Sequence, residues 1–198
     1  PNIKEILKAH EEEHSIHSTF YPTSTMVRHE RSFLSLKKEA TIDDLLESLR
    51  VYARYYDQLW KQGAKTEFLA YWKANQYSSE IIHEILLKED YLYDYLSNPT
   101  SNDEYGFPNE VIKHIKKMDI TIRDPEGQIL SKEKIHFAAW KIITQTWERY
   151  KKDVTRALNA VAELERMYGN NPEARLQILR LLSQEPMAKW HRLKKIMS

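Results

Sequence analysis

Residues 10–14 read His-Glu-Glu-Glu-His, which has the residue types and the spacing of a helical metal site. On a helix, His10 and His14 would lie on the same face, and His17 would follow one turn later. In zinc hydrolases with the HExxH pattern, the two histidines bind the metal and the glutamate after the first histidine is the general base. A zinc-dependent hydrolase that uses His10, Glu11 and His14 is therefore one chemistry that the sequence allows.

The surroundings of these histidines favour a different interpretation. The string lies near the first residue of the chain, whereas the corresponding protease helix lies inside a folded domain and a distant ligand completes its zinc site. Consecutive charged or titratable side chains are also typical of a helix that faces solvent or a partner protein. We therefore expect no stoichiometric metal, no cofactor and no enzymatic activity.

Other common catalytic signatures are missing from the sequence. The chain of 198 residues has four glycines, and none of them belongs to a GxGxxG, GxxxxGKS/T or GxSxG string. Cysteine is absent, which excludes disulfide bonds and zinc–thiolate sites. These features favour a protein that binds and assembles over one that catalyses a reaction.

Basic residues are concentrated in a short stretch that follows the histidines. Between residues 26 and 38, cations alternate with Phe33, Leu34 and Leu36. The pattern predicts an amphipathic segment whose cations contact phosphates while its apolar side packs on protein, although an ordinary surface helix gives the same pattern. Two arginines of the next helix extend this group. The cations that we expect to contact DNA phosphates are Arg28, Arg31, Lys37, Lys38, Arg50 and Arg54.

The elements that position these residues are predicted to be almost all helical. Residues 1–40 are expected to form a helical arm, and residues 41–198 a helical bundle domain. Thr41 and Asp44 match the start of a helix in which apolar residues repeat at helical spacing, with a pause near Gly63. No apolar run approaches the roughly 20 residues of a membrane span.

The period changes to that of a strand between residues 119 and 130. Ile120 and Ile122 alternate with polar residues, and residues 124–127 read Asp-Pro-Glu-Gly, which is typical of a turn. This segment predicts a small β-hairpin near 119–130 within the otherwise all-α fold.

The longest predicted helix spans residues 131–168, from a Ser131 cap to Gly169, which suits a left-handed C-terminal position. Its apolar residues repeat every seven positions in two rows, so the helix needs packing partners along its whole length. The first row, which we expect to pack in the core or between subunits, consists of Trp140, Trp147, Val154, Val161 and Tyr168.

The last third of the chain is basic, whereas the middle is acidic. Asn171 and Pro172 are predicted to start a helix, and Pro186 separates it from a final basic one. The final helix places apolar residues such as Trp190 opposite a row of Lys and Arg residues. This arrangement fits a membrane surface or an acidic partner as well as a helix that closes the end of a bundle.

Two short strings in this last third resemble a known family. Residues 156–159 (Arg-Ala-Leu-Asn) and 168–173 (Tyr-Gly-Asn-Asn-Pro-Glu), which lead into Ile178 and Leu179, are similar to the end of the major coat proteins of filamentous and rod-shaped archaeal viruses, the lipothrixviruses and rudiviruses. Within these strings, Tyr-Gly-x-Asn-Pro-Glu is a signal that stops one helix and starts another. The expected helical arm, helical bundle and lack of cysteine agree with that family.

The resemblance implies a structural virion protein that pairs with a like or paralogous coat subunit. Such subunits wrap double-stranded DNA, held in an A-like form, into a helical nucleocapsid. The filamentous members also carry a lipid envelope, which is a further implied partner. The implied location is the virion, assembled in the host cytoplasm.

The matched strings hold no DNA-contacting residues, so the expected phosphate contacts depend on the charge pattern alone. A helical protein–protein adaptor that does not bind DNA is the main alternative, and it would form a discrete complex with another protein without polymerising on DNA.

Overall fold

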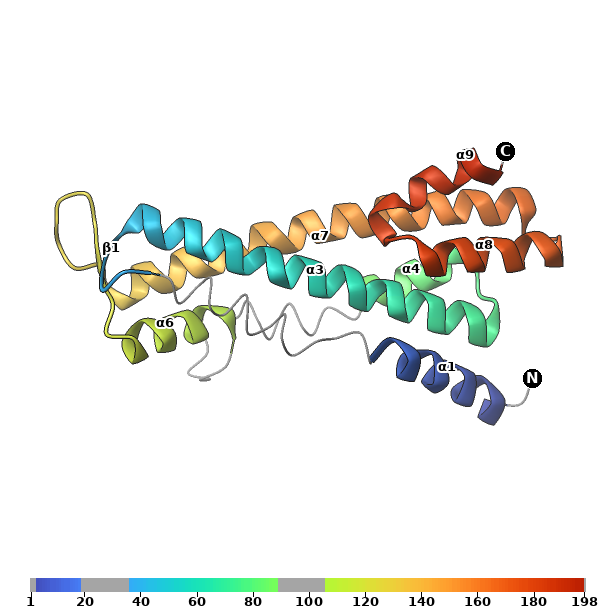
Figure 1. The fold of residues 1–198 in the computed structure, drawn as a ribbon, viewed down its shortest axis with the longest axis horizontal. Helices are drawn as coiled ribbons and strands as arrows, with labels where there is room; N and C mark the ends of the chain where they lie inside the picture. Colours follow the sequence, from blue (N-terminus) through green and yellow to red (C-terminus); the bar gives the residue numbers. More distant parts are fainter. Residues whose placement is uncertain (1–2, 19–35, 89–105, 198) are drawn as a thin grey trace. The chain divides into compact units, whose positions relative to one another are not determined.

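The computed structural model describes residues 3–18, 36–88 and 106–197, and these residues are mostly helical (Figure 1). The all-α class predicted from the sequence is therefore confirmed. Residues 19–35 lie outside the described parts of the chain, so the arm of residues 1–40 stays a prediction. The helices are α1 (Ile3–Ser18), α3 (Ile42–Asn75), α4 (Ser79–Lys88), α6 (Phe107–Lys117), α7 (Lys132–Tyr168), α8 (Pro172–Gln184), the 3-10 helix η1 (Met187–Arg192) and α9 (Leu193–Met197).

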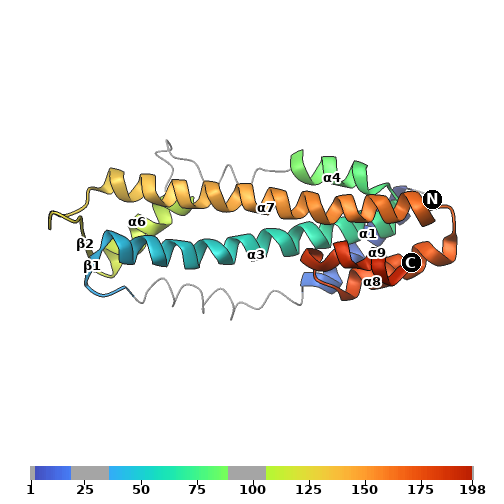
Figure 2. The same ribbon diagram turned by 90° about the horizontal axis from the view of Figure 1, so that it is seen from above.

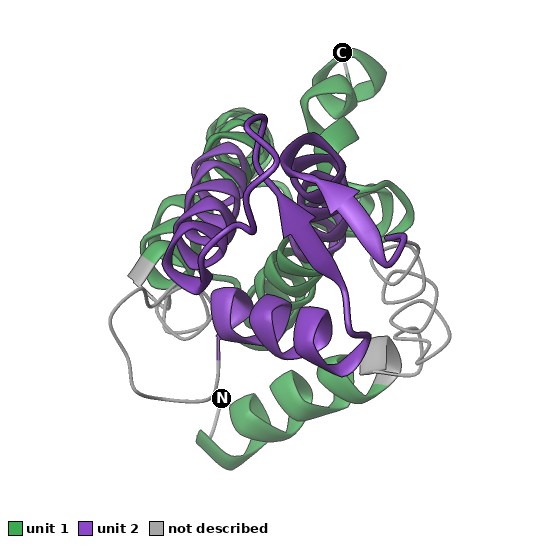
Figure 3. Ribbon diagram, turned by 90° about the vertical axis from the view of Figure 1, so that its left-hand side faces the viewer, with its two compact units in different colours: residues 1–21, 59–89, 150–198 green, residues 22–58, 90–149 purple. Residues whose placement is uncertain are grey.

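The chain divides into two compact units, each built from segments that are far apart in the sequence (Figure 3). Helices α3 and α7 pass from unit 2 into unit 1, so each unit contains part of each of these two long helices. Unit 1 consists of residues 1–21, 59–89 and 150–198, and unit 2 consists of residues 22–58 and 90–149.

Aromatic side chains form the core of unit 1. The later part of α3 lies beside the later part of α7, and the two helices run in the same direction (Figures 1 and 2). Trp60 of α3 and Tyr150 of α7 have ring centroids 5.5 Å apart. Phe68 of α3 lies 5.1 Å from the ring of Trp190, which brings the C-terminal segment onto the same core.

Polar contacts attach the shorter helices of unit 1 to α3 and α7. Lys73 of α3 pairs with Glu13 of α1 at 2.9 Å. The Ser79 N–H, at the start of α4, donates to a carboxylate oxygen of Glu165 on α7 at 2.8 Å. The Lys65 ammonium of α3 donates to the carbonyl that follows α8 at 2.8 Å, and burial lowers the pKa of this ammonium.

Aromatic contacts join α3 to α6 in unit 2. Tyr52 of α3 stacks on Phe107 with ring centroids 5.5 Å apart, and Tyr56 meets the same ring edge-on at 5.5 Å. The Tyr56 hydroxyl donates to Glu110 at 3.3 Å, and burial raises the pKa of this hydroxyl far above its ordinary value. The hydroxyl therefore stays protonated and remains a donor.

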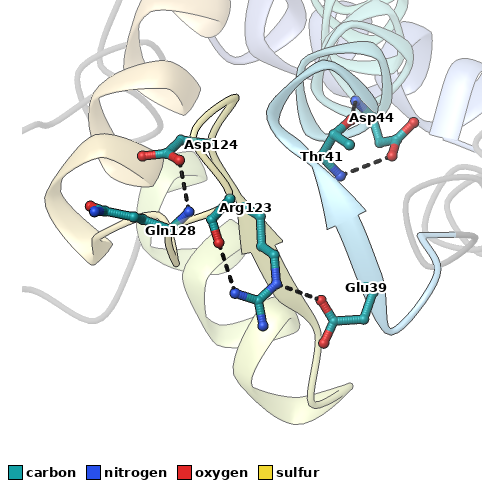
Figure 4. Close-up of polar contacts among 7 residues, drawn as sticks. Glu39, Thr41, Asp44, Arg123, Asp124 and Gln128 are labelled. Atoms are coloured by element: carbon teal, nitrogen blue, oxygen red, sulfur yellow. Dashed lines mark hydrogen bonds and ion pairs between the residues drawn. The ribbon is translucent and has the colours of Figure 1, made fainter.

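A two-stranded parallel sheet, β1 (Glu39–Thr41) and β2 (Thr121–Arg123), lies at the start of α3. Its register pairs Ala40 with Ile122, and both of these side chains are buried. Across the sheet, Arg123 donates from Nε to a carboxylate oxygen of Glu39 at 3.0 Å (Figure 4). Two segments that are distant in the sequence are thereby joined.

The hairpin predicted near 119–130 is therefore present only in part. Asp124 organises the expected turn, because its carboxylate accepts hydrogen bonds from the N–H of Glu126 at 3.0 Å and of Gln128 at 2.9 Å. Beyond the turn, the chain makes a single antiparallel bridge, between Arg123 and Ile129, and no second strand. The strand that pairs with β2 is β1, which local alternation of polar and apolar residues does not reveal.

The start of α3 was predicted correctly, but the sequence predicted an interruption that this helix does not have. The Thr41 N–H donates to Asp44 at 2.9 Å and the Asp44 N–H donates to the Thr41 hydroxyl at 3.2 Å, so the two residues cap the helix reciprocally (Figure 4). The predicted pause near Gly63 is wrong, because α3 continues through it. Burial of Trp60 and Ala64 on either side outweighs the cost of an interior glycine, which is about 1 kcal/mol.

Gly169 follows the last residue of α7 as predicted, but for a different reason. Its φ lies outside the left-handed region, and a Cβ at this position would lie 2.3 Å from the carbonyl oxygen of Glu165. Asn171 then caps α8, because its side chain accepts a hydrogen bond from the N–H of Glu173 at 3.0 Å. The helix-stop and helix-restart signal of the sequence thus has a structural basis in steric crowding and capping.

Three apolar side chains of the C-terminal segment are buried in unit 1, whereas Ile196 of α9 is largely exposed. Met187, Trp190 and Leu193 are exposed by 4%, 0% and 1%. Packing within unit 1 therefore accounts for these three positions of the amphipathic pattern. In the parts of the chain that the structure describes, no helix combines the length and the apolar character that crossing a membrane requires.

Candidate nucleic-acid interface

Three arginines of unit 2 meet around one hollow. Arg50 and Arg54 lie four residues apart on α3, so they share a face of that helix, and Arg149 comes from α7. The hollow has a volume of about 110 Å³. Gln145, one turn before Arg149, also lines it. Two helices therefore supply three guanidinium groups and one amide to the same small space.

Among the described residues, only a weak ion pair neutralises the charge of this arginine hollow. Arg50 pairs with Glu47 at 3.7 Å, and both side chains are more than half exposed, which makes this a weak surface pair. Within the described residues, Arg54 and Arg149 have no ion-pair partner. Guanidinium groups bind phosphate oxygens through pairs of N–H donors, so the hollow is suited to a phosphate or another anion.

The base of the hollow is held by the packing of α7. Ile142 and Thr146 line the hollow, and the Thr146 hydroxyl donates to the Ile142 carbonyl oxygen at 2.9 Å, which satisfies it locally. Trp147 and Ile143 are buried on the core side of the same helix. Because these residues fix the rotation of α7, Arg149 is kept on the face that meets the hollow.

The first apolar row of α7, predicted from the sequence, is buried to different degrees along its length. Trp147 is exposed by 4%, and Val154 and Val161 are fully buried. Trp140 and Tyr168 are partly exposed, and the Tyr168 hydroxyl donates to the carbonyl of Met197 at 3.2 Å.

The remaining predicted cations are placed as follows. Lys37 and Lys38 are exposed next to β1, and the Lys38 carbonyl oxygen accepts a hydrogen bond from Thr121 at 2.7 Å, which fixes the backbone there. The Thr41 N–H, and to a smaller extent the charge of Lys37, lower the pKa of Asp44. Arg28 and Arg31 lie outside the described residues, so their roles stay predictions.

Arg149 is the charged residue of this site that the sequence interpretation missed. Its spacing from Gln145 on an exposed side of a long helix was visible in the sequence. The meeting of this side with Arg50 and Arg54 depends on how α3 and α7 align, which is a tertiary property.

The histidines of α1 form a second cluster, in unit 1. His14 Nε2 lies 2.9 Å and His10 Nε2 lies 3.4 Å from the two carboxylate oxygens of Glu67 on α3. Glu11 is largely exposed, and its carboxylate lies 3.6 Å from Nδ1 of His10. The side chain of His17, the third histidine of the predicted face, lies outside the described residues.

Comparison with protein-family models, with curated proteins and with solved structures finds no significant match to this chain. The interpretation of its function therefore depends on the residues themselves and on the sequence resemblance.

Proposed function

We propose that this chain is a structural subunit that binds double-stranded DNA through backbone phosphates. It would pair with a like or paralogous subunit and build a helical nucleocapsid, and it would have no catalytic role. The observation that carries the proposal is the arginine hollow, in which Arg50, Arg54 and Arg149 meet with little neutralisation from the other described residues.

The geometry of the hollow favours phosphate over base recognition. Three guanidinium groups around about 110 Å³ accommodate a small anion such as a phosphate group, whereas reading a base requires a helix or strand inside a groove. In A-form duplexes the major groove is too narrow for side chains, so the contacts would follow the backbone. Binding that is independent of sequence is what a coat protein needs.

The resemblance of residues 156–159 and 168–173 to coat proteins of filamentous and rod-shaped archaeal viruses supports the assembly part of the proposal. The basic last third and the acidic middle would let neighbouring subunits meet through complementary charge. If a lipid envelope is a further partner, it would contact side chains other than the buried Met187, Trp190 and Leu193.

A salt titration of duplex binding tests the proposal. The logarithm of the binding constant should fall linearly with the logarithm of salt concentration, with a slope of about −0.9 for each neutralised phosphate. Arg54→Gln and Arg149→Gln should each reduce the magnitude of this slope by about one unit, equally on duplexes of different sequence. Arg180→Gln, an exposed arginine of α8 in unit 1, is the matched control and should leave the slope unchanged.

Negative-stain microscopy should then show filaments when the protein is mixed with duplex DNA, alone or with a paralogous subunit. A slope that is the same in all three variants would show that the hollow does not contact DNA. Absence of any duplex binding, together with a discrete complex with another protein, would favour the adaptor alternative.

A further inference from the structure

We propose that His10, His14 and Glu67 bind a divalent transition-metal ion of the zinc class, and that this ion fastens α1 to α3. The site is independent of the arginine hollow and of DNA binding. It also differs from the expectation drawn from the sequence alone, which placed no metal on this helix.

The three ligand atoms already have nearly the separations that a bound metal requires. One ligand atom from each residue lies within 4.8 Å of the others, and His14 Nε2 and His10 Nε2 lie 2.9 Å and 3.4 Å from different carboxylate oxygens of Glu67. In a tetrahedral zinc site with bonds of about 2.0–2.1 Å, neighbouring ligand atoms are about 3.3 Å apart. Small side-chain adjustments would therefore admit an ion at the centre of the cluster.

The surroundings of His10 give independent support. Its Nε2 atom is buried and, although it lies 3.4 Å from Glu67, forms no hydrogen bond with any described residue, whereas a buried polar nitrogen normally forms one. The ring is held in place, because its centroid lies 4.5 Å from the His14 ring and 4.6 Å from the Tyr71 ring. A metal ion would give this nitrogen the partner that it lacks.

The type of ligand indicates the type of metal. Two imidazoles and one carboxylate suit zinc and related first-row ions, whereas calcium and magnesium prefer oxygen ligands. The protein supplies three ligands, so a fourth position would be open to water or to a group from another molecule.

The position of Glu11 favours a structural site over a hydrolytic one. Its carboxylate lies beside Nδ1 of His10, which is the nitrogen on the other side of the ring from the metal-binding Nε2. A carboxylate in this place orients the imidazole and raises its basicity. A general base would instead have to reach the water bound to the metal.

The metal site lies next to another contact between the same two helices. Glu13 is 7% exposed and pairs with Lys73 of α3. The ion would thus supplement an existing attachment of α1. Because the ligands come from two helices, metal binding should stabilise the folded chain.

Metal analysis of the full chain tests this proposal. After incubation with zinc and dialysis, the wild-type protein should retain one equivalent of zinc, and its melting temperature should rise with added zinc. Glu67→Gln and His14→Gln should each weaken binding by at least about 100-fold, more than the 10–100-fold loss that is typical for residues outside the ligand set. His191→Gln, an exposed histidine of η1, is the control and should bind zinc normally.

Far-UV circular dichroism should show that the variants retain their helices, and either ligand variant is sufficient if the other does not fold. Cobalt(II) bound to the wild-type chain should give a visible spectrum that Glu67→Gln or His14→Gln abolishes. Wild-type protein that retains no stoichiometric zinc would overturn the proposal, as would binding that neither ligand variant weakens.

Glu11→Gln distinguishes the two possible roles of the metal. If Glu11 orients His10, the variant should bind zinc about 10–100-fold more weakly. Unchanged zinc affinity combined with loss of a hydrolytic activity present in the wild type would overturn the structural role and identify the site as that of a hydrolase.

Discussion

In unit 1, acidic and basic side chains meet across helices, whereas in unit 2 the arginines of α3 and α7 surround a hollow. Lys61 pairs with Asp153 at 2.8 Å, and Arg175 pairs with Glu165 at 3.3 Å, both in unit 1. In the described part of unit 2, Arg50 of the hollow has a single ion pair, with Glu47 of its own helix, and this pair is exposed. Parts of the same two helices thus use their charges in different ways.

This difference indicates two roles for the charged side chains: in unit 1 they stabilise the fold, and in unit 2 they are available to bind a partner. Partly buried pairs between helices contribute to the free energy of folding, whereas exposed cations contribute little and are available for phosphates. The aromatic cores of the two units, by contrast, should contribute equally to the free energy of unfolding. The following predictions test both statements, beginning with the largest effect.

Truncation of a core tryptophan should destabilise the protein by a similar amount in either unit. Trp147 in unit 2 is 4% exposed and Trp190 in unit 1 is fully buried. Each Trp→Ala variant should lower the free energy of unfolding by about 3–5 kcal/mol, measured by chemical denaturation. Phe137→Ala, at a position that is 60% exposed, should change it by less than about 1 kcal/mol. A loss below about 1 kcal/mol for Trp147→Ala would show that the first apolar row of α7 does not pack in a core.

Neutralising a charge should lower stability in unit 1 and weaken DNA binding in unit 2. Glu165 accepts from the Ser79 N–H at 2.8 Å and from Arg175 at 3.3 Å, so Glu165→Gln should cost about 2 kcal/mol of unfolding free energy. Arg149→Gln should change it by less than about 0.5 kcal/mol while weakening duplex binding. The comparison between the units would fail if Arg149→Gln were as destabilising as Glu165→Gln.

Acidification should slightly lower the free energy of unfolding through one histidine in each unit. Burial lowers the pKa of His83 in unit 1 and, with help from the charge of Lys132, the pKa of His136 in unit 2. Each histidine therefore contributes stability that is present above the unfolded pKa of about 6.5 and is lost as the pH falls towards the folded pKa. The effect should be small, because both histidines are partly exposed.

The measurement is the free energy of unfolding between pH 7.5 and about pH 5, with a chelator present to exclude metal effects at the other histidines. His83→Gln should flatten this dependence in part, since one of the two groups then no longer titrates. A stability that rises on acidification would contradict the direction of both pKa shifts.

Features that depend on neighbouring residues were predictable from the sequence. The Thr41 cap, the extent of α7 and the start of α8 at Pro172 follow from local hydrogen bonding and from the period of the apolar residues. The pause at Gly63 was predicted from a local rule as well, but burial on both sides overrides that rule. The parallel pairing of β1 with β2 was not predictable, because it joins segments that are distant in the sequence.

Each candidate site also has a part that was predictable from neighbouring residues and a part that was not. Clustered charge pointed to Arg50 and Arg54, whereas the spacing of His10 and His14 allowed a metal that the surroundings of the histidines argued against. The residues that complete each site come from a different helix, Arg149 in one case and Glu67 in the other. Neither carries a local signal of its role, since the alignment of the helices brings it to the site.

The interleaving of the two units also sets an order for folding during synthesis. Unit 2 is complete once residue 149 has left the ribosome, whereas unit 1 needs residues 150–198 as well. The histidine helix at the start of the chain must therefore wait for the last segment before its own unit can close, although Glu67 emerges much earlier. Because chains emerge from the N-terminus at about 5–20 residues per second, the arginine-bearing unit would fold first, and the unit stabilised by ion pairs would fold after residues 150–198 have emerged.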